Sequence, residues 1–184
     1  MSSLLKSIIA IVTLMLVTGC VQQSIRDRNS AFFQVPVGSI LVLHDTLEIK
    51  PGHTRLFVQR GVVTKHSDLD QYWPSCSFEV RDLKETPQQI QPDSFSVVRV
   101  QQGETEIVGL APVQVAALNL SRLAVWDGGN PLVSRLYHLW LTSDQQPNVM
   151  RVTCYGAMAG LPEADLPLFM EIEAALGPIA TIKL

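Results

Sequence analysis

The side chains that could carry out catalysis are scattered along this sequence rather than gathered in a motif. The histidines are His44, His53, His66 and His138. No two of them stand at the spacing of a helical metal site, and the sequence has no Gly-x-Ser-x-Gly elbow and no phosphate- or dinucleotide-binding loop. His44 precedes Asp45, but neighbouring residues of a strand point to opposite faces, so the two would not converge. We therefore predict a protein that is not an enzyme and uses no cofactor.

Two other patterns are weak candidates for a site. His138 stands between Tyr137 and Leu139 in an apolar stretch, which is typical of a half-buried histidine with a hydrogen-bond partner. Asp68 and Asp70 could offer oxygens to a calcium ion, but two carboxylates are too few to predict a metal site. The acids near the end of the chain fit a helix start and its exposed face: Glu163, Asp165, Glu171 and Glu173.

The first twenty residues have the pattern of an export signal. One positive charge, Lys6, precedes the uncharged run Ile8–Val17. That run has about the length of a secretory h-region and is shorter than the roughly twenty apolar residues that cross a bilayer. Leu16-Val17-Thr18-Gly19 then places small residues directly before Cys20. An ordinary signal peptide cut near Gly19, with Cys20 left as a plain residue, is the alternative.

This order of charge, apolar run, small residues and cysteine resembles the lipobox signal of bacterial lipoproteins. The resemblance implies that residues 1–19 are removed, that a diacylglycerol is attached to the thiol of Cys20, and that residues 20–31 tether the lipid to one folded domain, 32–184. Two or three acyl chains would anchor the protein firmly, whereas a single chain binds only marginally. Val21 stands where an Asp often marks inner-membrane retention in this family, which favours the periplasmic face of the outer membrane.

The charges are mixed along the chain. Its 14 Lys and Arg stand against 17 Asp and Glu, for a net charge of −3. No basic stripe predicts binding to nucleic acid, and no polybasic patch predicts binding to anionic lipid. The lipid on Cys20 would therefore be the contact with the membrane.

Cys76 and Cys154 remain once Cys20 is assigned to the lipid. In an oxidising compartment one pair has one possible connectivity, so we predict a disulfide between them. Two buried free thiols are the alternative. A thiol-redox role is disfavoured because the sequence has no Cys-x-x-Cys.

Short stretches of branched and aromatic residues alternate with turn signals in most of the chain. We expect strands at 40–49, 55–59, 75–80, 95–100, 105–110, 122–126, 135–141, 149–155 and 179–182. The stretch Gln101–Glu104 is expected to be a hairpin turn, whereas 62–71 and 86–92 are expected to be loops. Many short strands at such intervals predict a mainly β fold, an antiparallel sandwich or barrel.

One short helix is expected near the C-terminus. Asp165 can cap a helix that runs to Leu176, with Pro167 in its first turn, and Gly177 stands where a helix ends. The stretch 113–120 is ambiguous between helix and strand.

The aromatic and arginine residues admit two interpretations each. Tyr72 and Trp73 precede Cys76, so these rings, with Trp126 and Trp140, are predicted to pack in a core on the disulfide; a ligand pocket among them is the alternative. Five arginines stand in or beside expected strands: Arg55, Arg60, Arg122, Arg135 and Arg151. We expect them to pair with carboxylates across the sheet or to protect an edge.

These features favour a lipid-anchored, non-enzymatic domain that binds a protein of an envelope assembly. A small-ligand-binding lipoprotein and an inhibitor of a wall-degrading enzyme are the alternatives.

Overall fold

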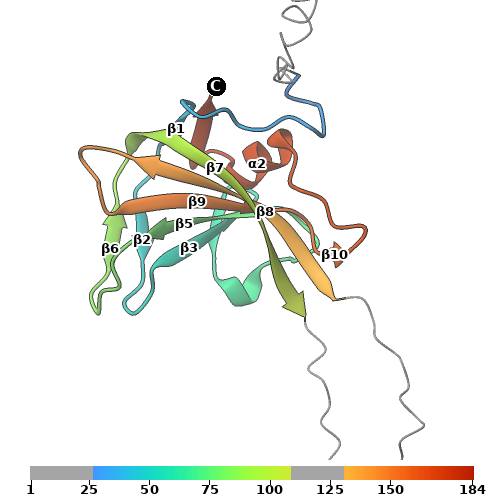
Figure 1. Cartoon of the computed structure of the whole chain (residues 1–184). Coiled ribbons are helices and arrows are strands. Elements are labelled where there is room, and N and C mark those ends of the chain that lie inside the picture. Colours follow the sequence, from blue (N-terminus) through green and yellow to red (C-terminus); the bar gives the residue numbers. More distant parts are fainter. Residues whose placement is uncertain (1–26, 109–130) are drawn as a thin grey trace, which may run out of the picture.

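The computed structural model describes residues 27–108 and 131–184, and these form a mainly antiparallel β fold (Figure 1). The nine strands of its main sheet are β1 (Ile40–Leu43), β3 (Arg55–Gln59), β4 (Val62–Thr64), β5 (Ser75–Val80), β7 (Asp93–Val108), β8 (Leu132–Thr142), β9 (Val149–Tyr155), β10 (Ala159–Gly160) and β11 (Ala180–Lys183). Their order is β11-β1-β7-β8-β9-β5-β3-β4, and β10 pairs with β8. The sheet curls into a half-barrel, which confirms the expected fold class.

The core lies on one face of this sheet. Its largest fully buried side chains include Leu41, Phe78, Phe95 and Leu139, which come from four different strands. The helix α2 (Phe169–Leu176) closes this side by burying Phe169, Ile172, Ala175 and Leu176. Phe33 packs against Phe169 with the ring centroids 5.2 Å apart, so the described chain joins the core soon after its start.

The disulfide predicted between Cys76 and Cys154 is confirmed. The two residues stand directly opposite each other on β5 and β9, with their Cα atoms 4.0 Å apart. Both are fully buried on the core face. The bond therefore joins two central strands that are already hydrogen-bonded neighbours.

The stretch 40–49 is two strands rather than one. After β1, the chain leaves the main sheet, and β2 (Leu47–Ile49) pairs with β6 (Gln88–Ile90) in a separate two-stranded sheet. The expected loop at 86–92 thus contains a strand. The strand β3, which follows β2 in the chain, pairs with β4 and β5 in the main sheet.

The predicted hairpin at Gln101–Glu104 is wrong, because β7 runs through it without a turn. Gly103 stands opposite Leu136 of β8, and a Cβ atom there would lie 2.9 Å from Leu136 Cδ1. The glycine therefore makes room for a neighbouring side chain inside a strand, a role that its sequence context does not distinguish from a turn.

The helix begins later than expected. Asp165 is not its cap, because Pro167 disfavours helical backbone at the residue before it. Instead, the carboxylate of Glu171 accepts a hydrogen bond of 2.8 Å from the backbone N–H of Leu168, directly before the first turn. The helix ends at Leu176 as predicted.

The turn between β3 and β4 is held against the end of α2. Arg60 and Gly61 both have positive φ, as the two-residue hairpin turn requires. The N–H of Gly61 donates to the carbonyl of Ala175 at 2.9 Å, and Gly177 packs so closely that a Cβ atom there would lie 2.5 Å from Gly61 Cα. This contact fixes the edge of the sheet from which the 65–74 segment departs.

The expected loop at 62–71 contains β4 and a 3-10 helix, His66–Asp68.

Several predictions fall outside the described residues: Cys20, the stretch 113–120, Arg122 and Trp126. Within the described ranges, no helix is long and apolar enough to span a bilayer.

Candidate functional site

The face of the sheet away from the core carries a row of charged side chains in register. Arg55 stands opposite Glu79, Glu79 opposite Arg151, Arg151 opposite Trp140, and Trp140 opposite Arg99. The row thus crosses β3, β5, β9, β8 and β7.

Glu79 is the centre of this row, and its side chain is only 3% exposed. Arg151 donates to Glu79 Oε2 from Nε at 3.0 Å and from Nη2 at 2.9 Å, and Thr153 donates to Oε1 at 3.1 Å. The Arg55 guanidinium is farther from Oε2, at 3.8 Å. A buried carboxylate is stable only when it is paired and hydrogen-bonded, and these contacts meet that condition.

His138 extends this network by one residue. Because the single hydroxyl proton of Thr153 goes to Glu79, Thr153 accepts from His138 Nδ1, at 2.8 Å. Burial lowers the pKa of His138 below its usual value, and the nearby charge of Arg151 lowers it further, although Glu79 opposes this. The predicted half-buried histidine is confirmed. The fully buried Thr153 hydroxyl is committed to Glu79, so this chain of contacts stabilises the sheet rather than offering a nucleophile.

Trp140 lies between two guanidinium groups. The Cζ atom of Arg99 is 4.1 Å from its ring centroid and that of Arg151 is 5.1 Å from it. Its ring thus faces the charged row and does not pack on the disulfide, contrary to the sequence-based interpretation. Such cation–π contacts attract the two guanidinium groups to the ring and so hold these side chains on the polar face of the sheet.

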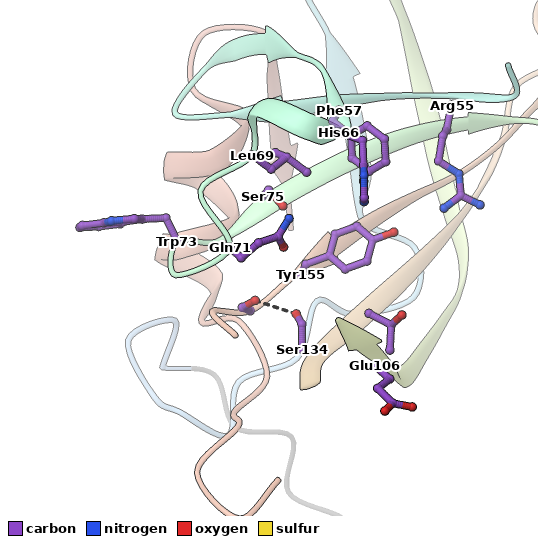
Figure 2. A pocket seen from close by; sticks show the side chains of 12 residues that line it. Arg55, Phe57, His66, Leu69, Gln71, Trp73, Ser75, Glu106, Ser134 and Tyr155 are labelled. Carbon is purple, nitrogen blue, oxygen red and sulfur yellow. Dashed lines mark hydrogen bonds between the residues drawn. The ribbon is translucent and has the colours of Figure 1, made fainter. Parts of the chain in front are cut away.

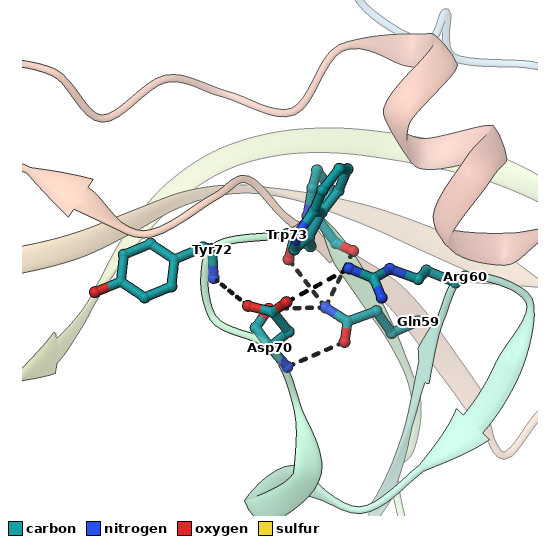
Figure 3. Close-up of polar contacts among 6 residues, drawn as sticks. Gln59, Arg60, Asp70, Tyr72 and Trp73 are labelled. Carbon is teal, nitrogen blue, oxygen red and sulfur yellow. Dashed lines mark hydrogen bonds and ion pairs between the residues drawn. The ribbon is translucent and has the colours of Figure 1, made fainter.

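The segment 65–74 folds over one end of this face, and Gln59 holds it in place (Figure 3). The side-chain amide of Gln59 donates to the carbonyl oxygens of Asp70 and Trp73 at 2.9 and 3.1 Å, and its oxygen accepts from the N–H of Asp70 at 3.1 Å. Asp70 in turn accepts from the Tyr72 N–H at 3.1 Å and forms an ion pair with Arg60 at 3.4 Å. The segment is therefore tied to β3 by side chains rather than by a strand.

This arrangement exposes the two rings that were predicted to be core. Tyr72 is 69% exposed and Trp73 is 55% exposed, and the prediction that they pack on the disulfide is wrong. Figure 3 shows Tyr72 directed away from the bracing contacts, whereas the Trp73 ring lies against Arg60, whose Cζ is 4.7 Å from its centroid. The exposed Val62 of the edge strand β4 stands opposite Gln59, so it lies on the face of the sheet that carries this segment. We call Val62, Tyr72 and Trp73 the ring-loop surface.

A pocket of about 200 Å³ lies between the 65–74 segment and the sheet (Figure 2). The segment contributes His66, Leu69, Gln71 and Trp73, and the sheet contributes Arg55, Phe57, Ser75, Thr105, Glu106, Ser134, Tyr155 and Gly156. Figure 2 shows Gln71 and Ser75 beside Tyr155, whereas the Trp73 ring is turned away from the pocket. The lining thus combines hydroxyl and amide groups, one guanidinium and apolar surface. This pocket is not the cluster of aromatic rings that the sequence offered as the alternative, because neither Tyr72 nor Trp140 lines it.

The other predicted residues are dispersed. His44 contacts Thr181 at 2.9 Å and is not joined to a catalytic group. Asp68 accepts from Ser67, and Asp70 is used in bracing, so the two do not converge. No three His, Cys, Asp or Glu side chains of the described ranges gather as a metal site. Arginine pairing is confirmed for Arg55, Arg60, Arg135 and Arg151.

Sequence reasoning missed Glu79, Ser75 and Tyr155. The signal was present in part, because alternation along 75–80 places Ser75, Ser77 and Glu79 on the face opposite Cys76. It did not indicate that Glu79 would be buried.

Comparison with protein-family models, curated proteins and solved structures finds no match to this chain.

Proposed function

We propose that this protein is a lipid-anchored lipoprotein of the bacterial cell envelope, whose β domain binds a protein partner of an envelope assembly without catalysing a reaction. The lipid on Cys20 would hold it at the periplasmic face of the outer membrane. The disulfide between Cys76 and Cys154 supports an oxidising compartment, because such bonds persist there and are rare where thiols are kept reduced.

The observation that carries the partner-binding proposal is the braced exposure of Tyr72 and Trp73. Aromatic rings of this kind are enriched at protein interfaces because they bury a large area with few rotatable bonds. The hydrogen bonds of Gln59 already fix the loop, so little conformational entropy would be lost when a partner binds. Val62 lies on the edge strand β4 opposite Gln59, and it adds exposed apolar area on this face of the sheet.

A photo-crosslinking amino acid placed at Tyr72 in the full chain, in cells, tests this proposal. We expect one discrete protein adduct at Tyr72 and none from the same amino acid at Leu83, which is also exposed. Adding Trp73→Ala should abolish the adduct, because the second ring of the ring-loop surface is removed. Equal adducts from both positions, or an adduct that Trp73→Ala leaves unchanged, would contradict the proposal.

The anchor is tested separately by Cys20→Ala. We expect this variant to lose incorporation of a labelled fatty acid and to leave the membrane fraction, because the thiol that carries the lipid is gone. Val21→Ala, one residue away, should keep both the label and the membrane association. Continued labelling of Cys20→Ala would refute the anchor.

Small-ligand binding is the second candidate function, and the pocket under the 65–74 segment supports it.

A further inference from the structure

The charged row contains three arginines, Arg55, Arg99 and Arg151, but only one carboxylate, Glu79. Glu79 carries one negative charge and already receives two hydrogen bonds from Arg151 and one from Thr153. Arg55 stands 3.8 Å away, beyond hydrogen-bonding distance, and its side chain is 43% exposed. Arg55 is therefore the outer partner of a loose ion pair, and it can donate its fork of N–H groups to a second anion while it stays near Glu79.

This guanidinium lines the pocket. In Figure 2 the Arg55 guanidinium and the Tyr155 hydroxyl are on the same side of the pocket, with Gln71 and Ser75 farther along it. Glu106 is the one carboxylate in the lining, and it lies at the end of β7 with its carboxylate directed away from Tyr155. A bound anion would therefore meet a guanidinium and hydroxyl donors together.

The surroundings of Arg55 are basic in a chain that is acidic as a whole. A second pocket adjoins the first and shares Arg55, Phe57 and His66 with it. Its lining adds Lys50 and Lys65 against one acid, Glu48. Together, the two linings and the neighbouring Glu79–Arg151 pair hold four cations against three acids, a small positive excess, whereas acids outnumber cations in the sequence. The positive electrostatic potential of these groups favours the binding of a negatively charged ligand.

The remaining lining is apolar and suits the body of such a ligand. Leu69 comes from the segment, Phe57 from β3, and the Tyr155 ring from β9. The volume of about 200 Å³ admits one ring or a short side chain, not an extended polymer.

We propose that this pocket binds a small carboxylate, with the carboxylate on Arg55 and Tyr155 and an apolar or aromatic body against Leu69 and Phe57. The carboxylate belongs either to a free organic acid or to the C-terminus of a peptide. The proposal deepens the small-ligand candidate and rests on it, but it does not depend on the ring-loop surface, so crosslinking at Tyr72 can fail while this site stands.

Titration of the isotope-labelled full chain in a non-ionic detergent, followed by protein NMR, tests the site. The probes are phenylacetate, its neutral amide phenylacetamide, a short peptide that ends in phenylalanine, and the same peptide with an amidated C-terminus. We expect the two carboxylates to shift the amide signals of Ser75 and Tyr155, whereas the two amides should bind at least about tenfold more weakly. Tighter binding of the peptide than of phenylacetate would assign a peptide C-terminus, and the reverse a free acid.

Arg55→Gln should weaken carboxylate binding at least about tenfold, because a charge-assisted contact is lost. Arg135→Gln is the matched control, since Arg135 is similarly exposed, at 40%, and pairs with Glu104 at 3.6 Å outside the pocket; it should leave binding unchanged. Unchanged amide signals of Leu41 and Phe95, which are buried on β1 and β7, would show that Arg55→Gln keeps the fold. Equal binding of acids and amides, absence of shifts, or equal effects of the two arginine variants would overturn the proposal.

Discussion

Replacing both Cys76 and Cys154 with alanine should lower the free energy of unfolding by about 5 kcal/mol. The bond closes a loop with a sequence separation of 78 residues, and the chain-entropy model gives about 4.5 kcal/mol for a loop of that size. Alanine avoids placing a hydroxyl in a fully buried site, so the loss reports the missing bond and a small cavity. Urea denaturation followed by circular dichroism measures it.

Reduction of the wild-type chain provides an independent measurement of the stability that the disulfide contributes. The reduced protein keeps both sulfur atoms, so it should lose a similar amount of stability without the cavity. Thiol titration of the native, unreduced protein should find Cys76 and Cys154 unreactive. Two reactive thiols would show that the bond does not form in the native protein. A loss under about 1 kcal/mol in both experiments would show that the bond does not stabilise the fold.

The sequence pattern predicted the central strands well because they alternate in the usual way. The bounds of β5 and β9 are as expected, and their pairing places Cys76 opposite Cys154. The failures have tertiary causes. Gly103 carries a turn signal but sits inside a strand, since Leu136 fills the space beside it. The sequence predicts β1 and β2 as one strand, because no local feature indicates that β2 pairs with β6 in a separate sheet.

The site was harder to predict than the fold. Alternation along one strand shows which side chains share a face, but not which residue of another strand stands beside them. Glu79 and Arg151 are 72 residues apart, and only the register of β5 and β9 joins them. The sequence predicts Tyr72 and Trp73 in the core because they stand shortly before Cys76. Their exposure depends on Gln59, whose hydrogen bonds to the loop have no sequence signature.

Glu79→Gln should destabilise the protein by about 3 kcal/mol, because it removes the charge that compensates Arg151 while keeping the shape of the side chain. Arg151 is 20% exposed, so water cannot fully solvate the guanidinium that is left. The matched control is Glu104→Gln. Glu104 pairs with Arg135 at 3.6 Å, with side chains 44% and 40% exposed, and such exposed pairs contribute at most about 1 kcal/mol.

A third variant separates the two possible sources of that loss. If the penalty comes from an uncompensated charge, Glu79→Met combined with Arg151→Met should recover much of it, since a buried ion pair can be replaced by apolar side chains at little cost. If the penalty instead came from disrupted packing of β5 on β9, the double variant would be at least as unstable as Glu79→Gln. If Glu79→Gln and Glu104→Gln lower the free energy of unfolding equally in urea denaturation, Glu79 is not the stabilising buried partner of Arg151. The same comparison bears on Arg55, because only a Glu79 that is already satisfied by Arg151 leaves Arg55 available to a ligand.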